Sequence, residues 1–216
     1  MPLRLGCYTK ETHKPRFTQS LTIKNSPFTI MNRCPWVPPH LPLYVQYHDE
    51  EWGVPVRDSQ ALFAKLCLDG AQAGLTWWTI LQRRKNYYAA FDGFDPHKII
   101  RYDDAKVAEL LGNAGIIRNR LKIQSVIKNA HGYLKIEEET GSFSDFLWSF
   151  VGGQTIVHEF HTLKDYLAIS PESEAMSKAL KKYGFTFVGP TIVYAFMQAV
   201  GMVNDHSMDC FRREEV

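Results

Sequence analysis

Residues 181–191 read KKYGFTFVGPT and connect two amphipathic segments near the end of the chain. The upstream segment opens at Ser170 and closes at Gly184, with capping residues typical of a helix start and a helix end. The downstream segment reads PTIVYAFMQAVG and places Pro190 near its first helical position, where proline is favoured. The pattern predicts two helices joined by a short glycine-containing turn.

The second of these helices begins at Gly189, Pro190 and Thr191. Its first backbone N–H groups have no partner inside the helix, and the helix dipole places partial positive charge there. Such an end can hold a phosphate without reading base sequence, and Lys181 and Lys182 lie just upstream. The alternative is an ordinary corner between two helices, which is common in helical proteins.

The preceding sequence is also dominated by helical patterns. Apolar residues at helical spacing, most of them behind a capping aspartate or proline, predict further helices within residues 58–74, 75–91, 94–100, 103–111, 118–139 and 144–153. Alternating strand patterns are scarce. We therefore expect an all-α chain, with long loops at 31–57 and 150–169.

The bulk composition is that of a globular protein with a core of its own. The 216 residues are 45% hydrophobic and 22% charged, and no apolar run reaches the roughly 18 residues that cross a bilayer. The net charge of +2 is too small to indicate nucleic-acid binding by itself, so any such site must come from local clustering. Four dispersed cysteines indicate reduced thiols or metal ligands rather than a disulfide framework.

The first 30 residues differ from the rest. They are rich in Thr, Ser and Pro and carry five basic residues against one acid, which leaves the remainder near −2. We expect residues 1–30 to be a poorly ordered basic extension before a helical domain at 31–216, with Met31 an alternative start. A targeting segment is the less favoured interpretation, because the amphipathic pattern is weak.

Two pairs of metal-ligand residue types lie at opposite ends of the chain. His206 and Cys210 are four residues apart, a spacing that places both on one side of a helical turn, and Cys34 and His48 stand near the start. Two thiolates and two imidazoles suit a closed tetrahedral zinc site. The alternative is a buried cysteine with capping histidines. The separate HEFH at 158–161 has the wrong spacing for a metalloprotease helix and is expected to be solvated.

An acid in an apolar, aromatic segment marks a third candidate site. The stretch CLDGAQAGLTWW at 67–78 holds Asp69, and a buried carboxylate is costly unless a partner meets it. Upstream, LYVQYHDEEWG adds Tyr47 and further aromatic residues. Aromatic faces with one carboxylate suit a flat, cationic ligand that donates hydrogen bonds. The alternative is a set of core aromatics, with Asp69 capping or pairing locally.

Several colinear motifs extend over residues 32–210. They are RCPW, YHDEEWGVP, DSQALFAKLCLDGAQAGLTWWTIL, FDP, AGIIRNRLKI, FLWSFV, GFTFVGPTIVYAFMQAVGMVNDH and the terminal Cys210. Together they resemble the 3-methyladenine-DNA glycosylase I family, a branch of the helix-hairpin-helix DNA glycosylases. The resemblance implies two helical lobes and one structural zinc that joins the chain ends through Cys34, His48, His206 and Cys210.

The same resemblance implies a function. The chain would be a monofunctional, monomeric enzyme that hydrolyses the N-glycosidic bond of 3-methyladenine in alkylated duplex DNA and leaves an abasic site. Gly189 and Thr191 would bind the DNA backbone, and the nucleotide would be flipped out of the stack. Tyr47 and Trp77 would sandwich the purine, while Asp69 would accept a hydrogen bond from its exocyclic amine. A bacterial cytoplasmic location is expected, with organellar or nuclear targeting by residues 1–30 as the alternative.

Two positions depart from what the resemblance implies. The family pattern has glutamate at 69, so Asp69 is about 1.5 Å shorter in reach, a gap that breaks a hydrogen bond or admits a water; Trp78 is expected to refill part of this space. Most of the superfamily places a catalytic Asp where Asn204 stands, so no general base is assigned, and Asp205 is expected to orient His206. The rival hypothesis is a catalytically weakened, zinc-stapled protein that binds DNA lesions. A metallohydrolase is disfavoured, since four protein ligands leave no open position.

Overall fold

Helices account for most of the computed structural model, which describes residues 32–216; the expected extension at 1–30 lies outside them. The α-helices are α1 (Pro42–Glu50), α2 (Ser59–Gln72), α3 (Trp77–Leu81), α4 (Arg84–Ala90), α5 (Pro96–Ile99), α6 (Asp104–Gly112), α7 (Arg120–Thr140), α8 (Phe143–Trp148), α9 (Pro171–Lys182) and α10 (Pro190–Ala199). Short 3₁₀ turns lie at Asp92–Phe94, Ser149–Val151 and Phe211–Glu214. Strands β1 (Ile156–Val157) and β2 (Val203–Asn204) form one short parallel pair.

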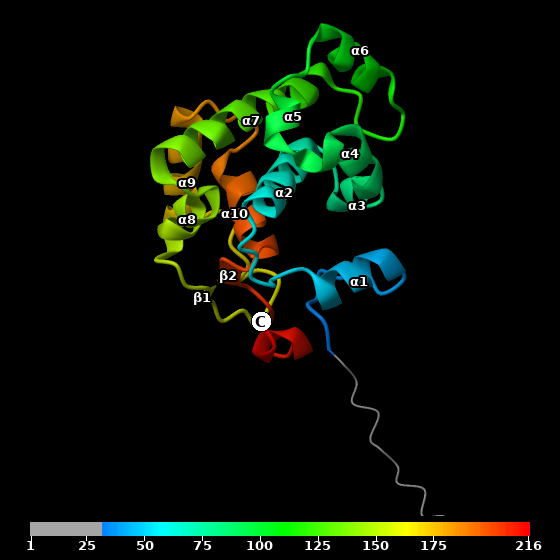
Figure 1. The fold of residues 1–216 in the computed structure, drawn as a ribbon. Helices are drawn as coiled ribbons and strands as arrows, with labels where there is room; N and C mark the ends of the chain where they lie inside the picture. Colours follow the sequence, from blue (N-terminus) through cyan, green and yellow to red (C-terminus); the bar gives the residue numbers. More distant parts are fainter. Residues whose placement is uncertain (1–31) are drawn as a thin grey trace, which may run out of the picture. The chain divides into compact units, whose positions relative to one another are not determined.

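Helix α2 lies at the centre of this arrangement (Figure 1). Its Leu62, Phe63 and Leu66 are fully buried, and it packs against α3, α7, α8 and α10. Helices α3 to α6 lie on one side of α2 and helices α8 to α10 on the other, while α7 contacts members of both groups. The two groups match the two helical lobes expected from the sequence.

The expected helix starts are confirmed by their caps. The side chain of Asp58 accepts a hydrogen bond from the Ala61 amide at 2.7 Å, and Asp95 and Asp103 cap α5 and α6 in the same way. Ser170 forms a reciprocal capping box at the start of α9. These signals are local in sequence, which is why they can be read without the fold.

Three local expectations are wrong. Residues 31–57 are not one long loop, because α1 forms within them behind Pro42. The helix expected at 75–91 is two helices, α3 and α4, separated at Gln82 and Arg83. His206 and Cys210 lie on an irregular turn, closed by the Cys210 amide donating to the Ser207 carbonyl at 2.9 Å, and not on a helical turn.

The turn between α9 and α10 is held by contacts with three helices, α7, α9 and α2. Asn129 on α7 donates to the Thr186 carbonyl at 3.2 Å and accepts from the Thr186 amide at 2.8 Å. Ser177 on α9 donates to the Val188 carbonyl at 2.6 Å. A Cβ added at Gly70 of α2 would lie 3.1 Å from the Cβ of Phe187, so the central helix packs closely against the same turn. The hairpin is therefore fixed relative to α2, the helix that carries Asp69.

Gly132 lets α7 approach the hairpin, and its replacement gives a test of this packing. A Cβ at 132 would lie 2.5 Å from the Phe185 ring and 2.6 Å from the Tyr183 carbonyl oxygen. We expect Gly132→Ala to lower the free energy of unfolding by about 2 kcal/mol despite better helix propensity, and the melting temperature by roughly 4–8 °C. Gly112→Ala, which adds a Cβ with nothing within 4 Å, is the matched control and should not lower it. Equal melting temperatures for the two variants would contradict this packing.

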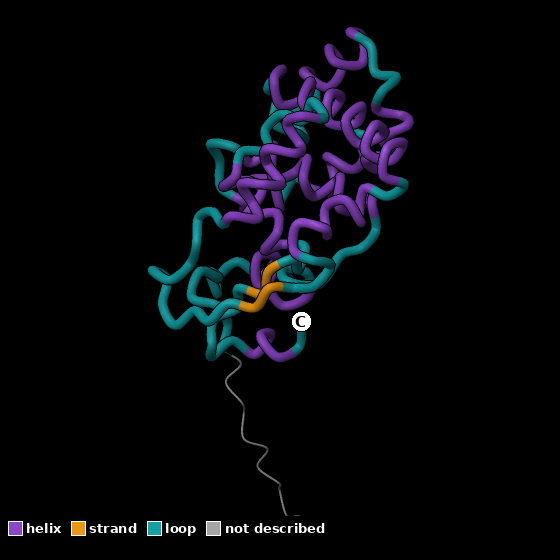
Figure 2. Tube along the Cα trace, turned by 90° about the vertical axis from the view of Figure 1, so that its left-hand side faces the viewer, coloured by secondary structure: helices purple, strands orange, loops and turns teal. Residues whose placement is uncertain are grey.

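The two ends of the described chain meet beside the strand pair. The Phe211 amide donates to the Asn32 carbonyl at 3.0 Å, and β1 and β2 lie at the loop-rich end of residues 32–216 (Figure 2). Across residues 32–216, none of the helices is long and apolar enough to cross a membrane.

Candidate base-binding pocket and metal centre

A cavity of about 340 Å³ opens between α1, α2, α3 and α10. Half of its lining residues are aromatic, and the whole lining comprises Trp36, Tyr44, Tyr47, Trp52, Asp69, Gln72, Trp77, Leu163, Tyr166, Leu167, Ala195 and Gln198. The three residues expected from the sequence, Tyr47, Asp69 and Trp77, thus line one cavity, which has the size and mixed lining of a small-ligand site.

The acid in this cavity has a partner on its own helix. Lys65 lies one turn before Asp69, and its Nζ donates to Asp69 Oδ1 at 2.5 Å. Burial raises the pKa of Asp69 and the charge of Lys65 opposes that rise; burial lowers the pKa of Lys65 and Asp69 opposes that fall. The alternative of local pairing is confirmed, yet Asp69 also lines the cavity. Its Oδ2 is buried without a hydrogen-bond partner among residues 32–216.

The aromatic walls meet at a corner. The ring centroids of Tyr47 and Trp77 are 5.3 Å apart with planes inclined by 46°. A purine stacked between two parallel rings needs about 7 Å between them, twice the usual carbon–carbon contact distance. The expected sandwich is therefore not the arrangement here, and the two rings offer adjacent walls. Burial also raises the pKa of Tyr47 well above its usual value, so this wall is a neutral phenol.

The indole groups of Trp77 and Trp78 differ in their relation to this cavity. Trp77 Nε1 is buried and has no hydrogen-bond partner in the described part of the chain. Trp78 does not line the cavity and instead stacks on Tyr44 with centroids 6.1 Å apart, so it does not refill the space beside Asp69. Asp69 Oδ2 and Trp77 Nε1 are thus two buried polar atoms of this wall without a partner among residues 32–216, and Tyr166 Oη is a third such atom elsewhere in the lining.

Asp205 supports the opposite wall of the cavity. Its carboxylate accepts from Gln198 Nε2 and from the Tyr194 hydroxyl at 2.8 Å each, and lies 2.7 Å from His158 Nδ1. One hydrogen of the Gln198 amide nitrogen is thereby engaged, and Asp205 fixes this side chain in the cavity lining. Asp205 makes no hydrogen bond to His206 within residues 32–216, so the expected orienting role is wrong. His158 is half-buried and paired, and only His161 is solvated as expected.

Asn204, next to Asp205, is used structurally. Its side-chain nitrogen donates to the carbonyls of Arg213 and Val216, at 3.0 and 3.2 Å, and its oxygen accepts from the His206 amide at 3.2 Å. An amide held in this way is not a proton acceptor for a reaction.

The four expected metal ligands converge in a buried cluster. The ligand atoms of Cys34, His48, His206 and Cys210 all lie within 4.8 Å of one another. His206 Nδ1 is 3.4 Å from each thiol sulfur, and His48 Nε2 is 3.5 Å from Cys210 Sγ. A tetrahedral zinc with ordinary bond lengths has sulfur–nitrogen edges of about 3.5 Å. The donor set and spacing fit a closed four-ligand site.

The second ring nitrogen of each histidine is also held, as metal-bound imidazoles require. His48 Nδ1 lies 2.8 Å from Asp49 Oδ1, and Asp49 is in turn bound by Arg33 Nε at 2.8 Å. His206 Nε2 lies 3.2 Å from the Trp52 carbonyl. Gly53 makes room for this ring, since a Cβ there would lie 2.7 Å from His206 Nε2.

The start of α10 has free backbone donors. Gly189 precedes the helix without any side-chain cap, and Thr191 in the first turn is exposed. The side chains of Lys181 and Lys182 lie with Pro190 around one surface depression. The residues expected to hold a phosphate are thus accessible and lie together.

A helix-hairpin-helix pair packed against an aromatic pocket with a buried acid is the arrangement expected of a DNA glycosylase of that class. The chain matches the model of the methyladenine glycosylase family over residues 36–213, and it belongs to that family.

Relatives of known identity agree with this assignment. The chain is 52% identical to DNA-3-methyladenine glycosylase 1 of Escherichia coli K12, over 83% of this chain and 96% of the relative. It is 48% identical to DNA-3-methyladenine glycosylase of Haemophilus influenzae, over 82% and 96%. A solved 3-methyladenine DNA glycosylase I from Staphylococcus aureus, determined for its recognition of 3-methyladenine, is 38% identical with a TM-score of 0.82, over 85% and 97%.

Several residues in or beside the pocket were not among those expected from the sequence. Lys65 was detectable, because a lysine four residues before an acid on a predicted helix lies over it. Gln198 and the residues around Tyr166 carried no such signal. These residues lie more than 80 positions after Trp77 in the sequence, yet they line the same cavity. The periodicity of apolar residues predicts helices but not contacts between segments so far apart in the chain.

Proposed function

We infer that the chain is a monofunctional DNA-3-methyladenine glycosylase, which hydrolyses the N-glycosidic bond of the alkylated base and leaves an abasic site for base excision repair. The observation that carries the inference is the buried Asp69 carboxylate, with one oxygen unpaired among residues 32–216, in a cavity of about 340 Å³ that is half lined by aromatic residues. Family membership and the names of the bacterial relatives support the substrate.

Binding would begin at the DNA backbone. The uncapped amides around Gly189 and Thr191 suit a phosphate beside the lesion, and Lys181 and Lys182 add charge that any sequence of duplex DNA attracts. Because the hairpin packs on α2 through Gly70, a phosphate held there is at a fixed place relative to Asp69. The lesion must leave the stack to enter the cavity.

In the cavity, Tyr47 and Trp77 would form adjacent walls around the purine, and Asp69 Oδ2 would accept from its exocyclic amine. The methylated base is already cationic, so its bond to the sugar is weak and it departs as a neutral molecule. An anionic wall favours the positive charge of substrate and transition state until water adds to the sugar. Lys65 does not line this cavity, so we expect no Schiff base and no strand cleavage.

The buried cluster would hold one structural zinc. Cys34 and His48 precede α2, while His206 and Cys210 follow α10, so an ion there would join two chain ends that otherwise depend on weak contacts. We further propose that residues 31–216 are the catalytic domain, that 1–30 form an extension outside it, and that the protein acts as a monomer on duplex DNA in a bacterial cytoplasm.

Base release from methylated duplex DNA tests the assignment. We expect the zinc-loaded protein to release 3-methyladenine, detected by chromatography, and to leave alkali-sensitive abasic sites without cutting the strand itself. The rival hypothesis is a protein that binds DNA lesions without releasing the base. It is favoured by the hydrogen bond that Lys65 already donates to one oxygen of Asp69. Tight binding to methylated DNA with no released base would favour that rival and refute the enzyme.

A further inference from the structure

We propose that Lys65 is a positioning residue for base recognition, which binds Asp69 Oδ1 so that the shorter acid presents Oδ2 alone to the ligand. The inference rests on the proposed function, since it concerns the same pocket. Lys65 itself does not line the base-binding cavity, and the proposed reaction gives it no role.

The geometry around Lys65 restricts Asp69 to one orientation. Lys65 Nζ lies 2.5 Å from Asp69 Oδ1 and 4.2 Å from the centroid of the Trp77 ring. The ammonium thus bridges the acid and one aromatic wall. Only 3% of the Asp69 side chain and 17% of the Lys65 side chain are exposed, so water does not compete effectively for this contact. A carboxylate tied at one oxygen has a single direction left for accepting.

Two unsatisfied polar atoms indicate where that direction leads. Asp69 Oδ2 and Trp77 Nε1 are both buried and lack partners among the described residues, and both residues line the base-binding cavity. A buried polar atom without a partner costs stability, and such groups persist where a ligand completes them. A purine edge that offers both a donor amine and a ring-nitrogen acceptor would satisfy the acceptor Oδ2 and the donor Nε1 together.

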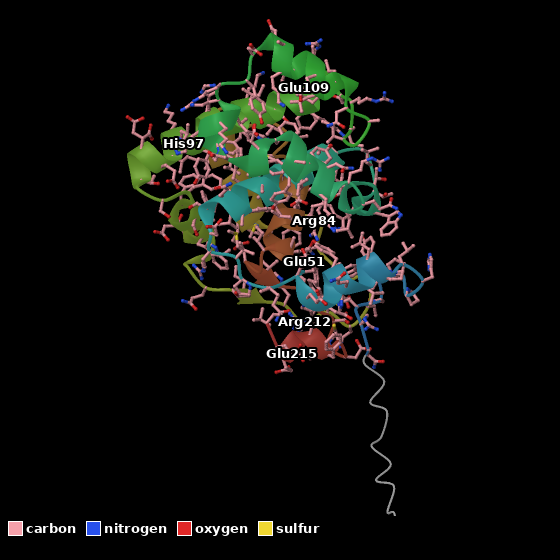
Figure 3. All side chains as sticks on the ribbon, turned by 45° about the vertical axis from the view of Figure 1, so that its right-hand side comes forward. Glu51, Arg84, His97, Glu109, Arg212 and Glu215 are labelled. Atoms are coloured by element: carbon pink, nitrogen blue, oxygen red, sulfur yellow. The ribbon has the colours of Figure 1, made fainter. Side chains whose placement is uncertain are left out.

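Lys65 also determines the charge state of the acid. Burial raises the pKa of Asp69, and the largest opposing influence is the charge of Lys65. The other titratable groups around the pair are Tyr47 of α1, Glu51 just after α1, Arg84 of α4 and Cys67 of α2. Arg84 and Glu51 lie next to each other (Figure 3) and are paired, so Lys65 is the cation left to Asp69 within the described chain.

The charge state of Asp69 determines how base binding depends on pH. The acceptor form of Asp69 is the carboxylate, which is present above its pKa and lost as the pH falls through it. Replacing Lys65 by an uncharged residue removes the influence that lowers this pKa. The loss of base binding on acidification should therefore begin at a higher pH in the variant than in the wild type.

The test is binding of free 3-methyladenine, followed by quenching of tryptophan fluorescence from pH 5 to 9, for wild type, Lys65→Met and Lys65→Arg. The affinity of each variant is compared with that of the wild type at the same pH, so the protonation of the ligand affects both equally and cancels in the ratio. We expect Lys65→Met to bind about tenfold more weakly at pH 7, as for a lost charge-assisted hydrogen bond, and to come within about threefold of wild type at pH 9. Lys65→Arg keeps the charge, and a second cavity of about 170 Å³ beside Lys65 gives the larger group room, so it should stay within about threefold throughout.

Three results would overturn the proposal. One is a pH profile of Lys65→Met that coincides with that of wild type. Another is a uniform loss of binding at every pH that folded Lys65→Met and Lys65→Arg proteins share, since that is the behaviour of a packing residue. The third is a Lys65-dependent covalent adduct with abasic DNA after borohydride reduction, which would make Lys65 a nucleophile. These outcomes are distinct from failure of the proposed enzymatic function. If the wild-type protein binds the free base as predicted but releases none from DNA, the enzymatic function is refuted and the role of Lys65 in base binding is still supported.

Discussion

Cys210→Ala is expected to abolish metal binding and to lower the melting temperature by about 10–20 °C, the equivalent of roughly 5 kcal/mol of stability for a domain of this size. The reason is geometric. Cys210 Sγ lies within 3.5 Å of both His48 Nε2 and His206 Nδ1, so its loss removes a ligand shared by the two ends of the described chain. What remains at this junction is the backbone bond from Phe211 to Asn32 and the contacts of aromatic rings, such as Phe211 with His48.

The measurement pairs metal content by mass spectrometry with thermal unfolding, and adds chelator to the wild type. Cys67→Ala is the matched control, because Cys67 is another buried, free thiol that lies outside the cluster. It should keep one zinc per chain and lose only about 1 kcal/mol. A Cys210→Ala protein that retains stoichiometric zinc, or a wild type purified without metal that melts at the same temperature with and without added zinc, would contradict the structural zinc.

The buried cluster of Cys34, His48, His206 and Cys210 also illustrates what the sequence could and could not predict. The four donors follow from ligand chemistry and from the resemblance of the terminal segments, and they do converge. The local geometry expected for His206 and Cys210 is wrong, since spacing alone does not distinguish a helical turn from an irregular one. Caps such as Asp58 and Ser170 were predictable because a cap and its partner lie three residues apart.

Some features of the base-binding cavity were likewise predictable from the sequence and others were not. Asp69 was identifiable as anomalous because an acid in an apolar segment is costly, and its partner Lys65 lies on the same helix. Helix α1 went unpredicted although it carries Tyr47, since only two of its residues are buried and its apolar face is weak. The corner formed by Tyr47 and Trp77 depends on how α1 packs against α3, which no sequence pattern specifies.

Asp69→Asn is expected to lower kcat/KM for release of 3-methyladenine by about 100-fold or more, the loss of roughly 3 kcal/mol of transition-state stabilisation. The amide oxygen of the new side chain would remain with Lys65, because an ammonium needs an acceptor. Its NH2 group would then occupy the place of Oδ2 and direct a donor at the exocyclic amine, itself a donor. The anionic wall that favours a cationic base would also be lost.

Initial rates of base release over a range of DNA concentrations give this ratio, and circular dichroism establishes that the variant is folded. Asp103→Asn serves as the control, since asparagine caps a helix as well as aspartate does and Asp103 lies outside the pocket. Asp69→Glu separates the two functional hypotheses. If the enzyme is active through the pair of Lys65 and Asp69, a longer acid displaces its oxygens from Lys65 and release of the base slows. If the protein is instead a catalytically weakened lesion binder, the longer acid is expected to restore release. Wild-type activity in Asp69→Asn would remove the carboxylate from base recognition altogether.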